Sequence, residues 1–80
     1  MGVTRVSGES VYSVQEINQV LERGIARLDD NKRAIYCMNI FEGMQVSEIA
    51  VKLDVKYKNV EKRLGAARKE IRSYMRRMLA

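Results

Sequence analysis

Histidine is absent from this chain of 80 residues, and cysteine occurs once, at Cys37. A single cysteine cannot form a disulfide within the chain, and without histidine the chain lacks the usual zinc ligands and the usual general base. The neighbours Tyr36 and Met38 supply neither a base nor a positive charge that would activate the thiol. We therefore interpret Cys37 as a small hydrophobic residue of the core and expect neither a metal ion nor a cofactor.

Other signatures of enzymes and of membrane proteins are also missing. The sequence has no glycine-rich phosphate-binding loop and no clustered pair of carboxylates. No apolar run approaches the roughly 18 to 20 residues that span a bilayer, and no signal-peptide pattern is present. We therefore expect a protein that is not an enzyme and that is soluble and cytoplasmic.

Positive charge, by contrast, is concentrated in one half of the chain. Residues 1–45 carry five Lys/Arg and six Asp/Glu, whereas residues 46–80 carry ten and four. Apolar residues make up 46% of the sequence, which favours one small folded domain over a disordered chain. The local excess of positive charge indicates a polyanionic partner, either a nucleic acid or an acidic membrane surface.

The first twelve residues and the remainder of the chain differ in pattern. Residues 1–12 show no sustained periodicity, so we expect a flexible tail or interdomain linker there and a folded domain over residues 13–80. A first helix should begin at Ser13, because Ser13 and Glu16 match the capping box. Apolar residues then recur every three or four positions, as on one side of a helix: Val14, Ile17, Leu21, Ile25 and Leu28.

A second helix is expected to follow directly. Asp29 and Asp30 can cap its N-terminus, where negative charge is favourable, and Gly43 can end it in a left-handed conformation. The residues expected on its core side are Ala34, Ile35, Met38 and Phe41.

The next segment predicts two helices that meet at a tight corner. A short helix over about 46 to 53, a turn at 54–55 and a longer helix reaching about residue 78 form a helix-turn-helix pattern. Ala50 is small enough for close approach, and Val55 can fill the corner. The inward residues of the short helix should be Val46, Ile49, Ala50 and Leu53. We thus expect an all-α fold, a small four-helix helix-turn-helix domain resembling a winged helix without the wing.

The last helix separates into two sides on a wheel of about 100° per residue. The buried side is expected to contain Val60, Leu64, Ala67 and Ile71. The opposite side holds five cations and a single acid, and we name it the basic stripe: Lys58, Glu61, Lys62, Gly65, Lys69, Arg72 and Arg76.

The basic stripe has two interpretations. Most charge runs are only the solvated side of an amphipathic helix. A solvated side usually mixes both signs, however, whereas this one is nearly all positive and lies on the second helix of a helix-turn-helix. We therefore favour DNA binding. For the terminal residues Tyr74, Met75, Met78 and Leu79 we favour closure of the core over the first helix, the alternative being an apolar surface for a partner.

Most of the chain resembles region 4 of bacterial sigma-70-type sigma factors, particularly those of the extracytoplasmic-function group. The resemblance covers residues 13 to about 75 and is carried by Leu28, Arg33 and Ile35 and by the segment FEGMQVSEIAVKLDVKYKNVEKRLGAARKEIR. The most specific matches are Glu42-Gly43, Glu48-Ile49-Ala50, Val60, Arg63-Leu64 and Ala67-Arg68. The resemblance implies a domain that reads the minus-35 promoter element in the major groove and promotes transcription initiation.

The resemblance also implies which residues meet DNA. Base contacts fall on Tyr57, Lys58, Glu61, Lys62 and, in the extracytoplasmic-function group, Gly65 and Ala66. Lysine can donate to guanine O6 and N7, and glutamate can accept from cytosine N4, so these side chains can specify bases. The expected phosphate contacts are Lys56, Arg63, Arg68 and Lys69, of which Arg63 and Arg68, taken singly, are equally consistent with ordinary surface cations.

The expected partners are double-stranded promoter DNA, the β-subunit flap of the RNA polymerase core and an anti-sigma factor, with no membrane involved. The implied location is the nucleoid in a bacterial cytoplasm. Region 2 of such factors has no counterpart in these 80 residues, so we expect either a fragment of a longer factor or a free-standing module. The unpatterned residues 1–12 favour the fragment.

Two alternative functions stay open. LuxR-type response-regulator output domains share a similar helix-turn-helix, but they usually show T-V-x-x-H in the recognition helix. This chain has NVEKR at residues 59–63, which fits a sigma factor better. The other alternative is a protein-interaction module that uses the same apolar grooves to hold an anti-sigma partner.

Overall fold

The computed structural model describes residues 12–80, which form four α-helices and no strand. The helices are α1 (Val14–Ala26), α2 (Asp30–Ile40), α3 (Val46–Leu53) and α4 (Tyr57–Met78). The expected all-α architecture is confirmed, and the bounds of α3 and α4 agree with the sequence prediction. The predicted tail falls almost entirely on residues 1–11, which lie outside the described residues.

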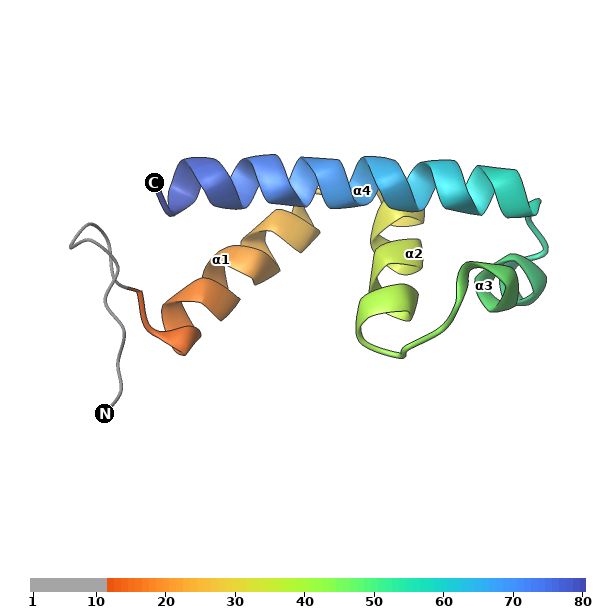
Figure 1. Cartoon of the computed structure of the whole chain (residues 1–80), viewed down its shortest axis with the longest axis horizontal. Coiled ribbons are helices and arrows are strands. Elements are labelled where there is room, and N and C mark those ends of the chain that lie inside the picture. Colours follow the sequence, from red (N-terminus) through yellow and green to blue (C-terminus); the bar gives the residue numbers. More distant parts are fainter. Residues whose placement is uncertain (1–11) are drawn as a thin grey trace.

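α4 is the long axis of the fold, since its 22 residues extend about 33 Å. α3, α2 and α1 follow one another along the same side of α4, from its N-terminal to its C-terminal end (Figure 1). The core lies between α4 and these three helices, and its most deeply buried residues are Ile35, Ile49 and Val60. α4 contributes the four residues predicted from the wheel, Val60, Leu64, Ala67 and Ile71, all of them buried.

Local capping explains where the first three helices begin. The Ser13 hydroxyl accepts from the Glu16 amide at 3.1 Å, and the Ser13 amide donates to the Glu16 carboxylate at 2.9 Å, as the capping box predicts. The Asp29 carboxylate accepts from the Lys32 amide at 2.8 Å and so caps α2. Glu48 accepts from the backbone amide that precedes α3, that of Gln45, at 2.8 Å.

Arg33 joins the end of α1 to the start of α2. Its guanidinium donates to the carbonyl oxygens of Leu28 at 2.7 Å, Ala26 at 3.3 Å and Ile25 at 3.4 Å, and it pairs with Asp30 at 3.0 Å. The last carbonyls of a helix have no partner within the helix, so Arg33 satisfies groups that α1 leaves open. This contact gives a physical reason for the spacing between Leu28 and Arg33.

Arg33→Met is expected to lower the free energy of unfolding by about 1 to 3 kcal/mol, because several carbonyl groups lose a charged donor. Urea unfolding followed by circular dichroism measures the effect. Arg23→Met is the control, since Arg23 is an exposed cation of α1 with no hydrogen bond to another side chain in residues 12–80. Equal stability of both variants and the parent chain would contradict the role given to Arg33.

The core side of α1 is shorter than its apolar pattern predicts. Val14 is 74% exposed and Ile17 is 37% exposed, whereas Ile25 and Leu28 are buried. α1 runs obliquely to α4, and its N-terminal half lies away from that helix (Figure 1). Leu28 itself lies past the end of α1, in the connection to α2. The prediction of a buried stripe along the whole of α1 was therefore wrong for its first two turns.

The core side of α2 also differs from the prediction. Ala34 is exposed and Phe41 is 62% exposed, while Tyr36 is buried. Phe41 caps α2 with α-helical dihedral angles, and its amide donates to the Cys37 carbonyl at 2.9 Å, so it lies on the same exposed side of the helix as Ala34, seven residues earlier. Gly43 adopts its left-handed conformation (φ 67°) in the following loop. Burial raises the pKa of the Tyr36 hydroxyl above its usual value, with a smaller opposing effect from the charge of Arg68.

The C-terminal end of α4 is fastened to α1 through Tyr74. Tyr74 is buried against Gly24, where a Cβ atom would stand only 3.1 Å from the ring, so glycine permits this close approach. The guanidinium groups of Arg27 and Arg77 lie 5.0 and 5.9 Å from the ring centre. Tyr74 thus closes the core as predicted, whereas Met78 is 48% exposed and does not.

Candidate nucleic-acid interface

The corner between α3 and α4 sets the direction in which α4 leaves α3. Asp54 ends α3 in the left-handed conformation (φ 56°, ψ 49°), which aspartate tolerates better than most residues. The Val55 amide donates to the Ala50 carbonyl at 3.0 Å, and the half-buried Val55 side chain packs against the core. The helix-turn-helix predicted from the sequence is therefore present, with Val55 at its corner.

Burial fixes how α4 is rotated about its axis. Val60 and Leu64 belong to the same core as Ile49 and Ala50 of α3, and these four residues are between 0 and 9% exposed. Because residues on the buried side of α4 recur with the helical period, the opposite side must face away from the core. Among residues 12–80, the other three helices all lie on one side of α4 and leave its opposite side uncovered (Figure 1).

All seven residues of the basic stripe are exposed. The ion pairs within residues 12–80 use the cations Lys32, Arg33 and Lys52, so the five cations of the stripe keep their charges open to a partner. Gly65 interrupts the stripe with open space, since a Cβ atom there would meet nothing within 4 Å. The stripe is therefore a positive surface with one acid, Glu61, and a gap at Gly65.

Glu70, the other acid in this part of α4, is directed to α2. Its carboxylate accepts a hydrogen bond from the Lys32 ammonium group. That bond raises the pKa of Lys32 above its usual value, against a smaller effect of desolvation, and the charges of Glu70 and Asp29 raise it further. The negative charge of Glu70 is therefore matched by Lys32 and does not neutralise the stripe.

The residues expected at bases lie together at the N-terminal half of α4. Lys58, Glu61, Lys62 and Gly65 share the exposed side, and Tyr57 is 51% exposed in the first turn. Ala66, which the resemblance also indicated, is half-buried. Asn59 was not among the expected residues, although it is exposed between Lys58 and Val60.

The residues expected at phosphates are more dispersed. Lys56 precedes α4 and is exposed, and Lys69 lies within the stripe. Arg63 is half-buried. Arg68 is exposed but donates to the side-chain oxygen of Asn39 at 2.8 Å, and Asn39 in turn donates to the Met44 carbonyl at 2.9 Å. Arg68 thus links α4 to α2 and to the loop after it, a contact that the sequence did not reveal.

Two further observations concern other kinds of site. Residues 12–80 contain no group of three or more His, Cys, Asp or Glu side chains that could hold a metal ion. None of the helices in this part of the chain is long and apolar enough to cross a membrane.

Comparison with known protein families gives a match to the family described as Sigma-70, region 4, over residues 18–71. The matched segment runs from the first turns of α1 to Ile71 on the buried side of α4 and includes the whole helix-turn-helix. Comparisons with curated proteins and with solved structures gave no match. The family is one of DNA-binding domains of sigma factors and not of enzymes, and its fold agrees with the four helices described above. The chain belongs to the Sigma-70 region 4 family.

Proposed function

We propose that this domain binds the minus-35 promoter element as part of an RNA polymerase sigma factor and thereby promotes transcription initiation. The observation that carries the proposal is the exposed basic stripe on the second helix of a helix-turn-helix. An α-helix with its side chains is about 10 to 12 Å across, and the major groove of B-DNA is about 12 Å wide. α4 therefore fits the groove with the stripe toward the bases and the core side away from them.

Base recognition is assigned to the N-terminal half of the stripe. Lys58 and Lys62 lie about one turn apart on the same side, so both can reach guanine O6 and N7 in the groove. Glu61 can accept from cytosine N4. Tyr57 contacts the edge of the groove from the first turn, and Gly65 leaves the space in which DNA approaches the helix backbone.

Phosphate contacts are assigned to Lys56, Arg63, Arg68 and Lys69. Lys56 precedes the base-reading segment and Lys69 follows it by about one turn, and both are exposed, so both are available to the flanking phosphates. Arg68 uses one guanidinium nitrogen on Asn39, and its remaining N–H groups can donate to a phosphate without breaking that bond. Phosphate contacts of this kind position the domain and add affinity for any sequence.

The polymerase partner is assigned to exposed apolar side chains at the start of α1 and at the end of α2. Val14, Ile17, Ile40 and Phe41 are between 37 and 74% exposed and lie outside the helix-turn-helix. Apolar side chains this exposed are suited to a protein partner, and the partner we propose is the flap of the polymerase β subunit. The motif at residues 42–50 supports placing the domain in the extracytoplasmic-function group, acting at the bacterial nucleoid.

We expect the isolated domain to bind promoter DNA weakly and with strong salt dependence. With three or four phosphate contacts, log affinity should fall by about 0.9 unit per contact for a tenfold rise in salt. A flap fragment that holds the domain should raise the apparent affinity without new base contacts. The measurement is a fluorescence titration of a minus-35 duplex, selected from a randomised pool, with and without the flap fragment.

The matched control is Ile17→Ser combined with Phe41→Ser. Both residues are exposed in the domain, so the variant should keep its salt dependence and lose only the effect of the flap. Nanomolar, sequence-specific binding by the isolated monomer, unchanged by the flap, would instead indicate an autonomous regulator.

A further inference from the structure

The side chain of Asn39, near the end of α2, connects three parts of the fold. Its amide oxygen accepts from the guanidinium of Arg68 at 2.8 Å, and its amide nitrogen donates to the Met44 carbonyl at 2.9 Å. A guanidinium can only donate a hydrogen bond, and a carbonyl can only accept one. These two partners therefore fix the orientation of the amide, and its oxygen is the end that faces Arg68.

The loop after α2 holds Asn39 in place. The Met44 amide donates to the Met38 carbonyl at 3.0 Å, and the half-buried Met44 side chain packs against the core. Asn39 is itself half-buried. The oxygen that accepts from Arg68 is therefore positioned by the fold on the α2 side of α4.

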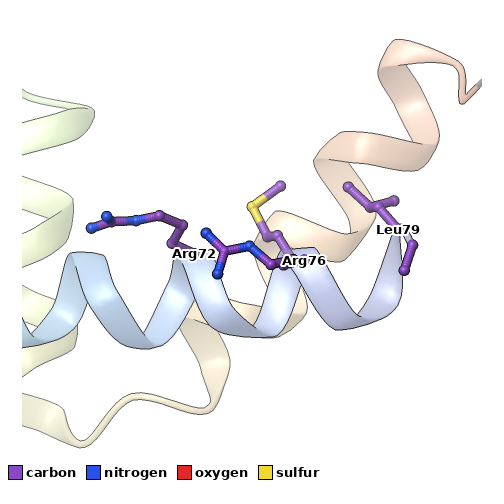
Figure 2. Close-up of a pocket in the computed structure, with 5 residues that line it drawn as sticks. Arg72, Arg76 and Leu79 are labelled. Carbon is purple, nitrogen blue, oxygen red and sulfur yellow. The ribbon is translucent and has the colours of Figure 1, made fainter. Parts of the chain in front are cut away.

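Arg68 borders the basic stripe on the side that faces α2. It follows Gly65 by three residues and precedes Arg72 by four, and residues at these spacings are neighbours on the surface of a helix. Arg72 and Arg76 project from one side of α4 as exposed side chains (Figure 2). Arg68 is exposed as well, but its bond to Asn39 ties it to α2. Arg68 thus combines exposure with a fixed position.

The partner of Arg68 carries no charge. The ion pairs within residues 12–80 place carboxylates beside Lys32, Arg33 and Lys52, which compensates the charge of each. An amide oxygen orients the guanidinium without supplying a negative charge. Arg68 therefore keeps its positive charge, and its remaining N–H groups can still donate to an anion.

We propose that Asn39 is a positioning residue for DNA binding, which holds the Arg68 guanidinium ready for a backbone phosphate while leaving its charge uncompensated. This inference rests on the function proposed above. A side chain that is held before DNA arrives loses less conformational freedom when the contact forms. The uncompensated charge preserves the attraction to the phosphate. Asn39 acts through Arg68 and meets no base.

Two substitutions at Asn39 separate orientation from charge in a duplex titration at several salt concentrations. Asn39→Ala removes the oxygen that holds Arg68 but leaves its charge, so affinity should fall about two- to tenfold with an unchanged slope of log affinity against log salt. Asn39→Asp places a carboxylate beside the guanidinium, so the slope should fall by about one, as for Arg68→Ala. Both substitutions lose the bond to Met44, so the difference between them does not depend on the loop.

Two further variants control for the added negative charge. Asn31→Asp makes the same change of charge at an exposed position in the first turn of α2 and should keep the parent slope. Asn39→Asp combined with Arg68→Ala should lose no more slope than Arg68→Ala alone, because no guanidinium is left to neutralise. None of these variants should alter the preferred base sequence.

The position of Arg68 can also be measured without DNA. In the parent chain, slow rotation of the held guanidinium should give separate Nη signals in the NMR spectrum, and Asn39→Ala should merge them. Merged signals in the parent chain would overturn the positioning role. This readout stays valid if the parent chain shows no salt-dependent duplex binding, a result that would contradict the DNA-binding function itself.

Three results of the duplex titration would overturn the proposal. Equal slopes in the two Asn39 variants would reduce Asn39 to a structural link between helices. Unchanged affinity in Asn39→Ala would show that Arg68 needs no positioning. A further loss of slope when Asn39→Asp is added to Arg68→Ala would show that the carboxylate repels DNA directly.

Discussion

Ile49→Asp is expected to leave the domain largely unfolded at 25 °C, and Leu64→Ala to lower its free energy of unfolding by about 2 to 5 kcal/mol. Ile49 is 0% exposed and Leu64 is 4% exposed where α3 packs on α4. Alanine would leave a cavity at position 64, while aspartate at position 49 would place a charge in a core that contains no charged side chain among the described residues. A domain of 80 residues has a stability of only about 4 to 12 kcal/mol in total.

Urea unfolding and the thermal midpoint measure both effects. Val51→Asp is the matched control, because Val51 lies on the same helix and is 82% exposed. Its free energy of unfolding should stay within about 0.5 kcal/mol of the parent value. An unchanged thermal midpoint for Leu64→Ala or Ile49→Asp would refute the packing of the helix-turn-helix.

The second large effect concerns recognition of DNA. Lys62→Ala or Glu61→Ala should change the preference for one base pair by about 1 to 3 kcal/mol, because each removes a donor or acceptor at a base edge. Arg63→Ala or Arg68→Ala should weaken all sequences alike and reduce the slope of log affinity against log salt by about one. The slope of log affinity against log salt separates the two classes of variant. It is measured by titrating each variant with one duplex at several salt concentrations. A loss of salt slope in the Glu61 variant would contradict its role at a base, since glutamate does not neutralise phosphate.

Sequence patterns predicted the helix-turn-helix well because its signals are local. The wheel of α4 identified Val60, Leu64, Ala67 and Ile71 as the buried side, and the structure buries all four. Because α1, α2 and α3 all pack on the same side of α4, the helical period of α4 fixes both its buried and its exposed side.

The first two helices were predicted less well because their burial depends on how they cross α4. The apolar period of α1 continues to Val14, but its N-terminal half lies away from α4, so periodicity alone overstated the core. The bond between Arg68 and Asn39 joins residues 29 positions apart, and no local pattern indicates it. Arg33 was identified by resemblance, while its contacts with the end of α1 required the structure.

The exposure of the basic stripe agrees with the sequence, but its contacts with DNA remain a proposal. Exposure shows that Lys58, Glu61 and Lys62 are available, and the pairing of Glu70 with Lys32 shows why the stripe stays positive. The base preference of variants in the stripe separates a reader of bases from a surface that attracts any polyanion.

The most direct measurement is the base preference of the parent chain and of four single-alanine variants on duplexes with a randomised minus-35 segment. The variants replace Glu61, Lys62, Arg63 and Arg68. We expect the Glu61 and Lys62 variants each to alter the preference at one position, and the two arginine variants to keep the parent preference with lower affinity. Equal loss on preferred and scrambled sequences for all four variants would show that α4 attracts DNA by charge alone and would contradict sequence recognition by the stripe.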